Sequence, residues 1–387
     1  MRSMLALRSR LFVAMGLSSA ALTPLACGGD ANSSNEGVGG GSSGTSGISG
    51  SAGMATGGAA GTSGSRAGAA GMAAGGSAGS SGSSAGAAGG SAGVAGAGGN
   101  GGSAGDEFCQ PWPGCQSVRR PFLVGADMRS SVVAERDDWA HDLPSVQIEH
   151  ARTAELLAAS WLKDALEEHA SIAAFARFTL LLLSVGAPPE LVIASQRASL
   201  DEVRHARECF ALAQRYGSRH VGPAELQVAD SISVVTLAEL AAPNVAEGCV
   251  GETLGALLAA EQLTLASDQE VRRVLARVVK DEERHAELAW RFLAWALRQG
   301  GTPVAEAAQR AFDAATEELD RMPIVDYGVD VDVWHAHGRA TCAEARALSR
   351  NGIRNVIAPC LRALLEQSSV RERSHAVRAP SPNSPGA

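Results

Sequence analysis

The sequence predicts an all-α protein, a four-helix bundle with a long crossover between its second and third helices and additional C-terminal helices. Three observations favour this fold class. Apolar residues recur every three or four positions in four long segments, the spacing of a helix with one buried face. The motif Asp-Glu-x-Arg-His occurs twice, with Glu202 and Glu282 80 residues apart. Short turns join the segments in pairs, and a connection of about 25 residues between the pairs is long enough to cross the bundle.

The four helices are expected at residues 151–185, 189–216, 244–266 and 268–298. The sequence Gly186-Ala187-Pro188-Pro189 separates the first two, because glycine and proline end helices. Ser267-Asp268-Gln269-Glu270 has the pattern of a capping box and is expected to start the fourth helix. Within each pair, the two arms are of similar length, so charged residues near their centres lie level with one another.

Each apolar stripe carries charged residues at its centre: Glu168 on the first helix, Glu202 and His205 on the second, Glu252 on the third, and Glu282 and His285 on the fourth. In each repeated motif the glutamate and histidine are three residues apart, so they share one helix face. An unpaired buried carboxylate costs several kcal/mol, a penalty that a bound metal removes. The six residues therefore predict a site for two metal ions.

Other residues near this site are open to more than one interpretation. Glu167 and Glu247 fall off the apolar stripes and are expected in solvent, and His169 is expected to be peripheral. Three glycines surround Glu252 on the third helix, which indicates close helix packing, an opening beside the metals, or a π-bulge that re-aims Glu252. These glycines are Gly248, Gly251 and Gly255.

The N-terminus has the pattern of an exported protein. Arginines precede an apolar run that ends in small residues before Cys27, which is typical of a secretory signal over residues 1–27. Cys27 resembles the lipidation site of bacterial lipoproteins, although Pro24 stands where that motif usually has leucine; plain secretion is the alternative. Residues 28–105 are almost wholly Gly, Ser and Ala and are expected to form a disordered linker to the cell-envelope membrane.

The remaining segments flank the predicted bundle. Residues 106–149 are expected to begin the folded part, with a possible local disulfide between Cys109 and Cys115. Cys209 and Cys249 lie on the metal-ligand stripes and are interpreted as buried thiols, with an interhelical disulfide or metal ligation as alternatives. Helices over 301–370 are expected to pack on the bundle, and 371–387 to be a disordered tail. An Asp- and His-rich loop at 326–337 is expected to be solvated, with binding of a further ion as its alternative.

Residues 150–300 resemble the ferritin-like di-iron carboxylate proteins, in which two helices each give one glutamate and two give Glu-x-x-His. The resemblance implies that Glu202 and Glu282 bridge two metals, with Glu168 and Glu252 as terminal ligands. The longer motif is similar to that of di-iron monooxygenases and acyl desaturases, in which the aspartate holds a ligand histidine. This implies that Asp201 serves His285 and Asp281 serves His205, across a pseudo-twofold axis, while Arg204 and Arg284 hold the aspartates.

The resemblance implies an exported oxidoreductase that uses O2 or peroxide on a small organic molecule. It would carry two iron ions, with Mn/Fe or Mn/Mn pairs as alternatives, and would need an electron donor that the sequence does not identify. A ferroxidase or peroxide scavenger, and a non-catalytic bundle lipoprotein with a vestigial site, remain as alternatives. The net charge of −8 and the lack of a basic stripe argue against nucleic-acid binding.

Overall fold

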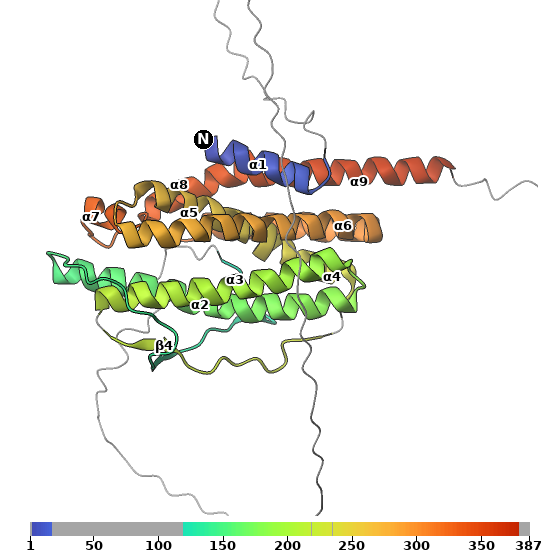
Figure 1. Cartoon of the computed structure of the whole chain (residues 1–387). Coiled ribbons are helices and arrows are strands. Elements are labelled where there is room, and N and C mark those ends of the chain that lie inside the picture. The colour runs from blue at the N-terminus through green and yellow to red at the C-terminus, as the bar shows by residue number, and fades with distance from the viewer. Residues whose placement is uncertain (1, 18–118, 218, 234, 379–387) are drawn as a thin grey trace, which may run out of the picture. The chain divides into compact units, whose positions relative to one another are not determined.

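The computed structural model describes residues 2–17, 119–217, 219–233 and 235–378, which are mostly helical (Figure 1). The helices, with π-helical stretches marked η, are α1 (Arg2–Ala14), α2 (Ala151–Ser184), α3 (Pro189–Gly217), α4 (Leu237–Pro243), η2 (Asn244–Glu252), α5 (Thr253–Leu265), α6 (Gln269–Arg321), α7 (Val331–Ala336), α8 (Cys342–Gly352), η3 (Ile353–Ile357) and α9 (Ala358–Arg378). Two antiparallel pairs of short strands accompany them: β1 (Leu123–Val124) with β2 (Asp127–Met128), and β3 (Val133–Glu135) with β4 (Val221–Pro223). The prediction of an all-α protein is confirmed.

The helices α2 and α3 form an antiparallel pair whose bounds agree closely with the predicted ones. The turn between them uses Gly186 at a φ of 66°, a conformation that glycine adopts without steric cost. Pro189 then opens α3, where its fixed φ suits a first helical residue and its missing N–H is not needed. Deeper in the pair, Thr179 Oγ1 donates to Ser195 Oγ over 2.8 Å, so the helices are tied by a buried polar contact as well as by apolar packing.

The third predicted helix begins as a π-helix. After α3 the chain runs back along the bundle to α4, which ends at Pro243 (Figure 1). Proline cannot donate a backbone hydrogen bond, and beyond it the i→i+5 pattern of η2 continues to Glu252 before α5 resumes the α-helical pattern. The π-bulge interpretation of the glycines around Glu252 is therefore confirmed, together with close packing at Gly248, described below.

The fourth predicted helix starts one residue later than the capping-box pattern indicated. Asp268, and not Ser267, is the N-cap: its side chain accepts from Val271 N over 3.0 Å. Arg215 also binds both Asp268 carboxylate oxygens, at 2.8 and 2.9 Å, which favours the aspartate in this position. The helical run α6 extends through the predicted boundary and is broken at Gly301, whose φ is 53°.

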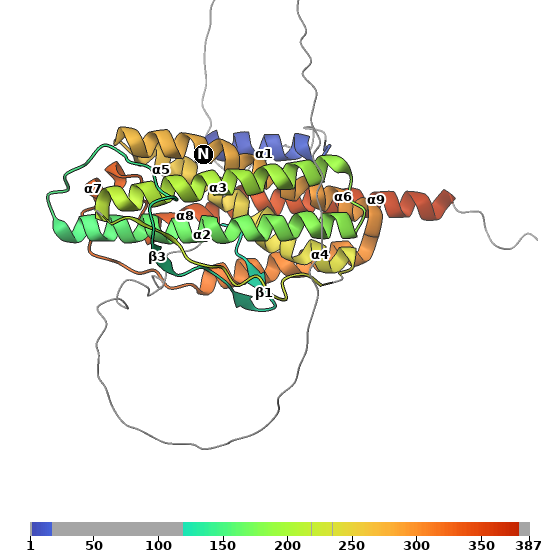
Figure 2. The same cartoon turned by 60° about the horizontal axis from the view of Figure 1, so that its bottom comes forward.

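The helices pack against one another in layers. Figure 1 shows α2 and α3 in one layer, α5 and α6 in the next, and α1 with α9 on the other side of α6. The segment that carries β1 and β2 lies over α2, where Phe122 packs on Ala170 and Ala174 (Figure 2). All the described helices belong to one compact unit.

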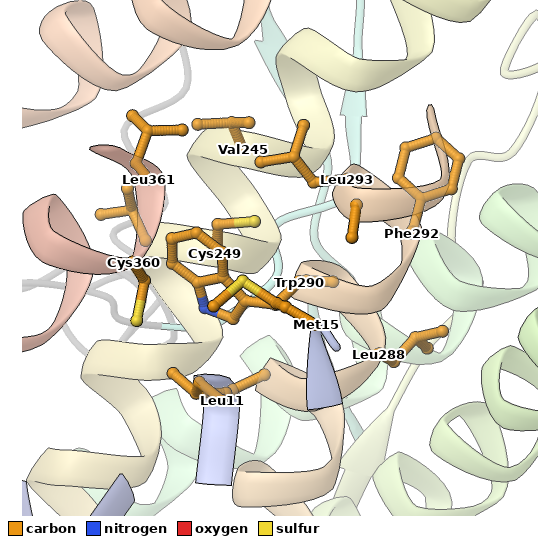
Figure 3. Packing of buried hydrophobic residues seen from close by; sticks show 14 of the residues in the cluster. Leu11, Met15, Val245, Cys249, Leu288, Trp290, Phe292, Leu293, Cys360 and Leu361 are labelled. Atoms are coloured by element: carbon orange, nitrogen blue, oxygen red, sulfur yellow. The ribbon is translucent and has the colours of Figure 1, made fainter. Parts of the chain in front are cut away.

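The helix α1 buries its apolar face against α6 and η3. Its contribution to the core is Met4, Leu7, Leu11, Phe12 and Met15. Figure 3 shows part of this cluster, with Leu11 and Met15 among Trp290, Cys249 and Cys360. None of the described helices has both the length and the hydropathy needed to cross a membrane.

The C-terminal region departs from the prediction in one respect. α9 continues to Arg378, so the prediction of a disordered tail from residue 371 is wrong over 371–378. Beyond Glu366 the sequence loses its apolar periodicity, and for that reason the end of the helix was placed too early. Cys27, the linker at 28–105 and the pair Cys109 and Cys115 lie outside the described residues.

Candidate metal centre

All six predicted ligand residues are buried, and the fold brings them together. Glu168 comes from α2, Glu202 and His205 from α3, Glu252 from the end of η2, and Glu282 and His285 from α6; none is more than 2% exposed. They form two groups whose candidate ligand atoms all lie within 4.8 Å of one another. The first contains Glu168, Glu202, His205 and Glu282, and the second contains Glu252, Glu282 and His285. Each group can hold a metal ion, and Glu282 belongs to both.

Each histidine is bound by the aspartate of the other copy of the motif, through its Nε2 atom. His205 Nε2 lies 3.1 Å from Asp281 Oδ2, and His285 Nε2 lies 3.4 Å from Asp201 Oδ2. In each case an imidazole N–H at Nε2 donates to the carboxylate, so that Nδ1 faces the glutamates. The cross-pairing that the resemblance implied is therefore present. It exists because α3 and α6 place the two copies side by side.

Two arginines bind the aspartates in turn. Arg284 Nη2 donates to Asp201 Oδ2 over 2.9 Å and to Asp281 Oδ1 over 2.6 Å. Arg204 forms an ion pair with Asp201. Both arginines are about half exposed, so their charges are screened by water, while their ends fix the orientation of buried carboxylates. The arginine role expected from the sequence is present in the contacts.

Four polar atoms of the cluster lack hydrogen-bond partners in the described part of the chain. Among the described residues, the buried side-chain atoms without a partner include Glu202 Oε2, Glu282 Oε1, His205 Nδ1 and His285 Nδ1. The distance from His205 Nδ1 to Glu282 Oε1 is 3.4 Å, and that from His285 Nδ1 to Glu202 Oε1 is 3.0 Å without hydrogen-bond geometry. Buried polar atoms are normally paired, and four unpaired atoms of metal-binding type in one place fit a site for metal ions.

The pKa values of the cluster reflect crowded acids and imidazoles. Burial alone would lower the pKa of His205, but its hydrogen bond to Asp281 and the carboxylates of Glu202 and Glu282 raise it well above its usual value. Burial and the Glu282 charge raise the pKa of Glu252 well above its usual range. Burial acts in the same direction on Glu202, but both histidines outweigh it and lower the pKa of Glu202 to about 2. Protons on the imidazoles therefore neutralise carboxylates in the absence of metal, and metal binding must displace them.

Two arginines that the sequence did not single out reach Glu168 and Glu252. Arg119 forms an ion pair with Glu168, and Arg120 Nε donates to Glu252 Oε1 over 3.2 Å. The Arg120 side chain is 2% exposed. Its guanidinium carbon lies 4.7 Å from the centroid of the Phe175 ring and 4.9 Å from that of Phe178. Glu168 and Glu252 thus each have a cationic partner, and the two partners are adjacent in the sequence.

The absence of a side chain at Gly248 leaves room for Arg120 beside η2. A Cβ atom on Gly248 would lie 2.5 Å from Arg120 Nη2 and 2.6 Å from Ala289 Cβ, both too close for a real contact. Gly248 is therefore required for Arg120 to pass between η2 and α2 and reach Glu252. No periodicity marks residues 119 and 120, and the only signal in the sequence is the adjacent pair of arginines ahead of Pro121.

The prediction that Glu247 is solvated is wrong. It is buried, 3.9 Å from Arg120 and 4.0 Å from Arg177 measured between charged atoms. In a π-helix residues five apart lie on the same face, so Glu247 faces inward with Glu252. Glu167 is partly exposed and paired with Lys163. His169 contacts Ser131 and Trp139, away from the cluster, as expected.

Within the part of the chain that the structure describes, neither the cysteines nor the acidic loop belongs to the cluster. Cys209 and Cys249 are buried free thiols, which confirms the preferred interpretation. Cys342 is disulfide-bonded, which the sequence analysis did not predict. In the loop at 326–337, Asp330 caps α7, and the histidines bind protein groups: His335 contacts Glu344 and His337 contacts Tyr216.

Comparisons of the chain with protein-family models, with curated proteins and with solved structures found no match.

Proposed function

We propose that the protein binds two transition-metal ions at this cluster and uses them for oxidation by O2 or peroxide. One observation carries the proposal: two buried groups of carboxylates and imidazoles share Glu282, and the inward-facing Nδ1 atoms of His205 and His285 have no partner. A ligand set rich in carboxylate, with imidazole, suits iron and manganese. Two iron ions are the first choice, with Mn/Fe and Mn/Mn pairs as the alternatives.

The protein's own groups would prepare the site for this chemistry. Glu168, Glu202, His205 and Glu282 would hold one ion and Glu252, Glu282 and His285 the other, and the aspartates would fix the ring orientation of the histidines. Such a pair of ions, when bound, supplies electrons to O2 or peroxide. The burial of every ligand residue keeps bulk water away from the ions, and the carboxylates balance their positive charge.

The proposal includes a ferritin-like bundle and a location outside the cytoplasm. The helices α2, α3, η2 with α5, and α6 supply the ligands in the order expected for that family, with a long connection after the second. The N-terminal pattern supports export and a lipid anchor at Cys27. Replacing Cys27 with alanine should release the protein from the membrane fraction. Recovery of wild-type protein from the cytosol with Met1 intact would contradict this location.

Metal content is the first test of the site. Wild-type protein reconstituted anaerobically with iron or manganese should hold two ions per chain by elemental analysis. Glu282→Ala should abolish the pair, because Glu282 belongs to both ligand groups. Glu167→Ala is a matched control on the same bundle, since Glu167 binds Lys163 outside the cluster, and it should retain both ions. A wild-type protein without bound metal under these conditions would refute the proposal.

The reaction is tested by rapid mixing of the iron-loaded, reduced protein with O2 and, separately, with H2O2. Oxidation should be visible as a change in absorbance within seconds. A protein that stays reduced for hours with both oxidants would exclude the oxidoreductase function. Release or storage of the oxidised iron, at a rate that no organic molecule changes, would instead identify a ferroxidase, for which iron is the substrate.

A further inference from the structure

A cavity of about 80 Å³ lies beside the cluster of candidate metal ligands, with Glu282 in its wall. Much of the lining is apolar, and small residues of α5 leave the space open. The residues that matter here are Trp161, Gly255, Leu258, Ala259, Trp334 and Glu282. The partly exposed residues Lys163 and Glu167 also line the cavity, so it extends from near the surface to a candidate metal ligand.

Apart from Glu282, the charged groups in this wall already have charged partners. Arg339 Nη1 donates to Asp164 Oδ2 over 2.6 Å, and its Nη2 lies 3.4 Å from the other oxygen. Arg119 pairs with Glu168 and Asp164, and Lys163 pairs with Glu167. A charged guest would lose its hydration without gaining a free counter-ion from these groups, which disfavours ions in the cavity.

One fully buried donor among the residues that line the cavity has no partner in the described part of the chain. Trp161 is 1% exposed, and among the described residues no group accepts from its Nε1. The Arg339 guanidinium carbon lies 4.7 Å from the centroid of the Trp161 ring, which holds the indole in place. The other cavity tryptophan, Trp334, donates to Ala340 O over 3.2 Å. Buried indole N–H groups usually find an acceptor, and the Trp161 N–H, on a residue that lines the cavity, has none among the described residues.

We infer that this cavity selects the organic substrate of the proposed metal site, and that the substrate is a small uncharged molecule with one hydrogen-bond acceptor. Short alcohols, aldehydes and ketones have this chemistry. A cavity of roughly 150 Å³ holds benzene, so one of about half that volume takes on the order of three or four non-hydrogen atoms. Trp161 Nε1 would donate to the guest oxygen and position the molecule next to Glu282. The inference rests on the proposed function for its chemistry, but its binding test does not require metal.

The test is nuclear magnetic resonance of the metal-free full chain labelled with ¹⁵N at tryptophan, which has six indole signals. The probes are propan-1-ol, propionate and propylammonium, which are similar in size and differ in charge. The Trp161 signal, assigned by its loss in Trp161→Phe, should move saturably with propan-1-ol, and the charged probes should bind at least tenfold more weakly. The indole of Trp290, which donates to Thr253, is an internal control that should stay fixed.

Two variants make the result specific to the cavity. Ala259→Leu should fill the space and abolish the propan-1-ol shift, while leaving Trp161 and its signal present. Trp161→Phe should weaken propan-1-ol binding by about three- to tenfold, measured by ligand-observed saturation transfer, because it removes one neutral hydrogen bond. Equal binding of the three probes, an unchanged shift in Ala259→Leu, or no shift with any probe would overturn the inference. Metal content measured in parallel separates its failure from failure of the proposed function.

Discussion

Replacing Arg120 with methionine tests whether the arginine compensates the charge of Glu252 when no metal is bound. Methionine keeps an apolar chain between Phe175 and Phe178 but removes the donor that lies 3.2 Å from Glu252 Oε1. Both members of the pair are at most 2% exposed, so solvent cannot replace the lost charge. The metal-free variant must then bury a carboxylate without its partner, or protonate it.

The size of the effect follows from the burial of the pair. Opposite charges about 4 Å apart attract by about 4 kcal/mol at an effective dielectric constant of about 20. Removing one member of a buried pair costs about 3–5 kcal/mol. Burial already raises the pKa of Glu252, and loss of Arg120 raises it further, so the acid form is favoured at low pH. Stability of the variant should therefore fall as pH rises through the pKa of folded Glu252, and the loss should be about 3–5 kcal/mol at pH 8 and clearly smaller at pH 5.

Urea unfolding of metal-free wild type and variant at both pH values measures this loss as a shift in midpoint at constant slope. Arg310→Met is the matched control, because Arg310 is 71% exposed and its ion pair with Glu306 contributes at most about 1 kcal/mol. The reasoning is refuted if Arg120→Met loses less than about 1 kcal/mol at pH 8, or loses the same amount at pH 5 and pH 8.

Further predictions concern other contacts of the site and the core. Asp201→Asn and Asp281→Asn should each weaken metal binding about 10–100-fold in chelator competition, because the histidines lose their anionic partners. Gly248→Ala should destabilise the protein by about 1–3 kcal/mol in urea, since its Cβ would clash with Ala289 Cβ. Burial opposes ionisation of Asp164, but two arginines hold its pKa well below its usual value. Its contribution is present above about pH 4 and is lost as pH falls, so Asp164→Asn should flatten the acid side of the stability curve. Burial raises the pKa of Cys209 to about 12, so a thiol reagent at pH 8 should modify it only after unfolding.

The sequence was sufficient to predict which candidate metal ligands are buried, because helical periodicity decides which residues share a buried face. Glu168 and Glu282 could be assigned from their positions on apolar stripes, before any contact was known. The cross-pairing of His205 with Asp281 was expected only from the resemblance of the repeated motif to that of di-iron proteins, and the contact is present in the structure. Local spacing therefore carries most of the information about the centre of the site.

The parts that sequence reasoning missed depend on tertiary contacts or on a different helical period. Arg120 lies in a non-periodic segment, and only its docking between α2 and η2 brings it to Glu252. Glu247 was assigned to solvent on an α-helical rotation of 100° per residue, whereas the π-helix turns it inward. The N-cap at Asp268 was missed because Ser267 and Glu270 have the spacing of a capping box that would begin one residue earlier.

The packing of α1 has a consequence for the order of events in the cell. Its apolar face is part of the core, and Arg10 on the same helix binds Glu287 of α6. As the proposed export leader, this helix would be concealed once the helices have assembled, so an export machinery could recognise it only on a chain that is still unfolded. Folding and export would then compete kinetically for the same residues. Variants that weaken the contact of Leu11 or Met15 with the core, without changing the hydropathy of the segment, would shift that competition towards export.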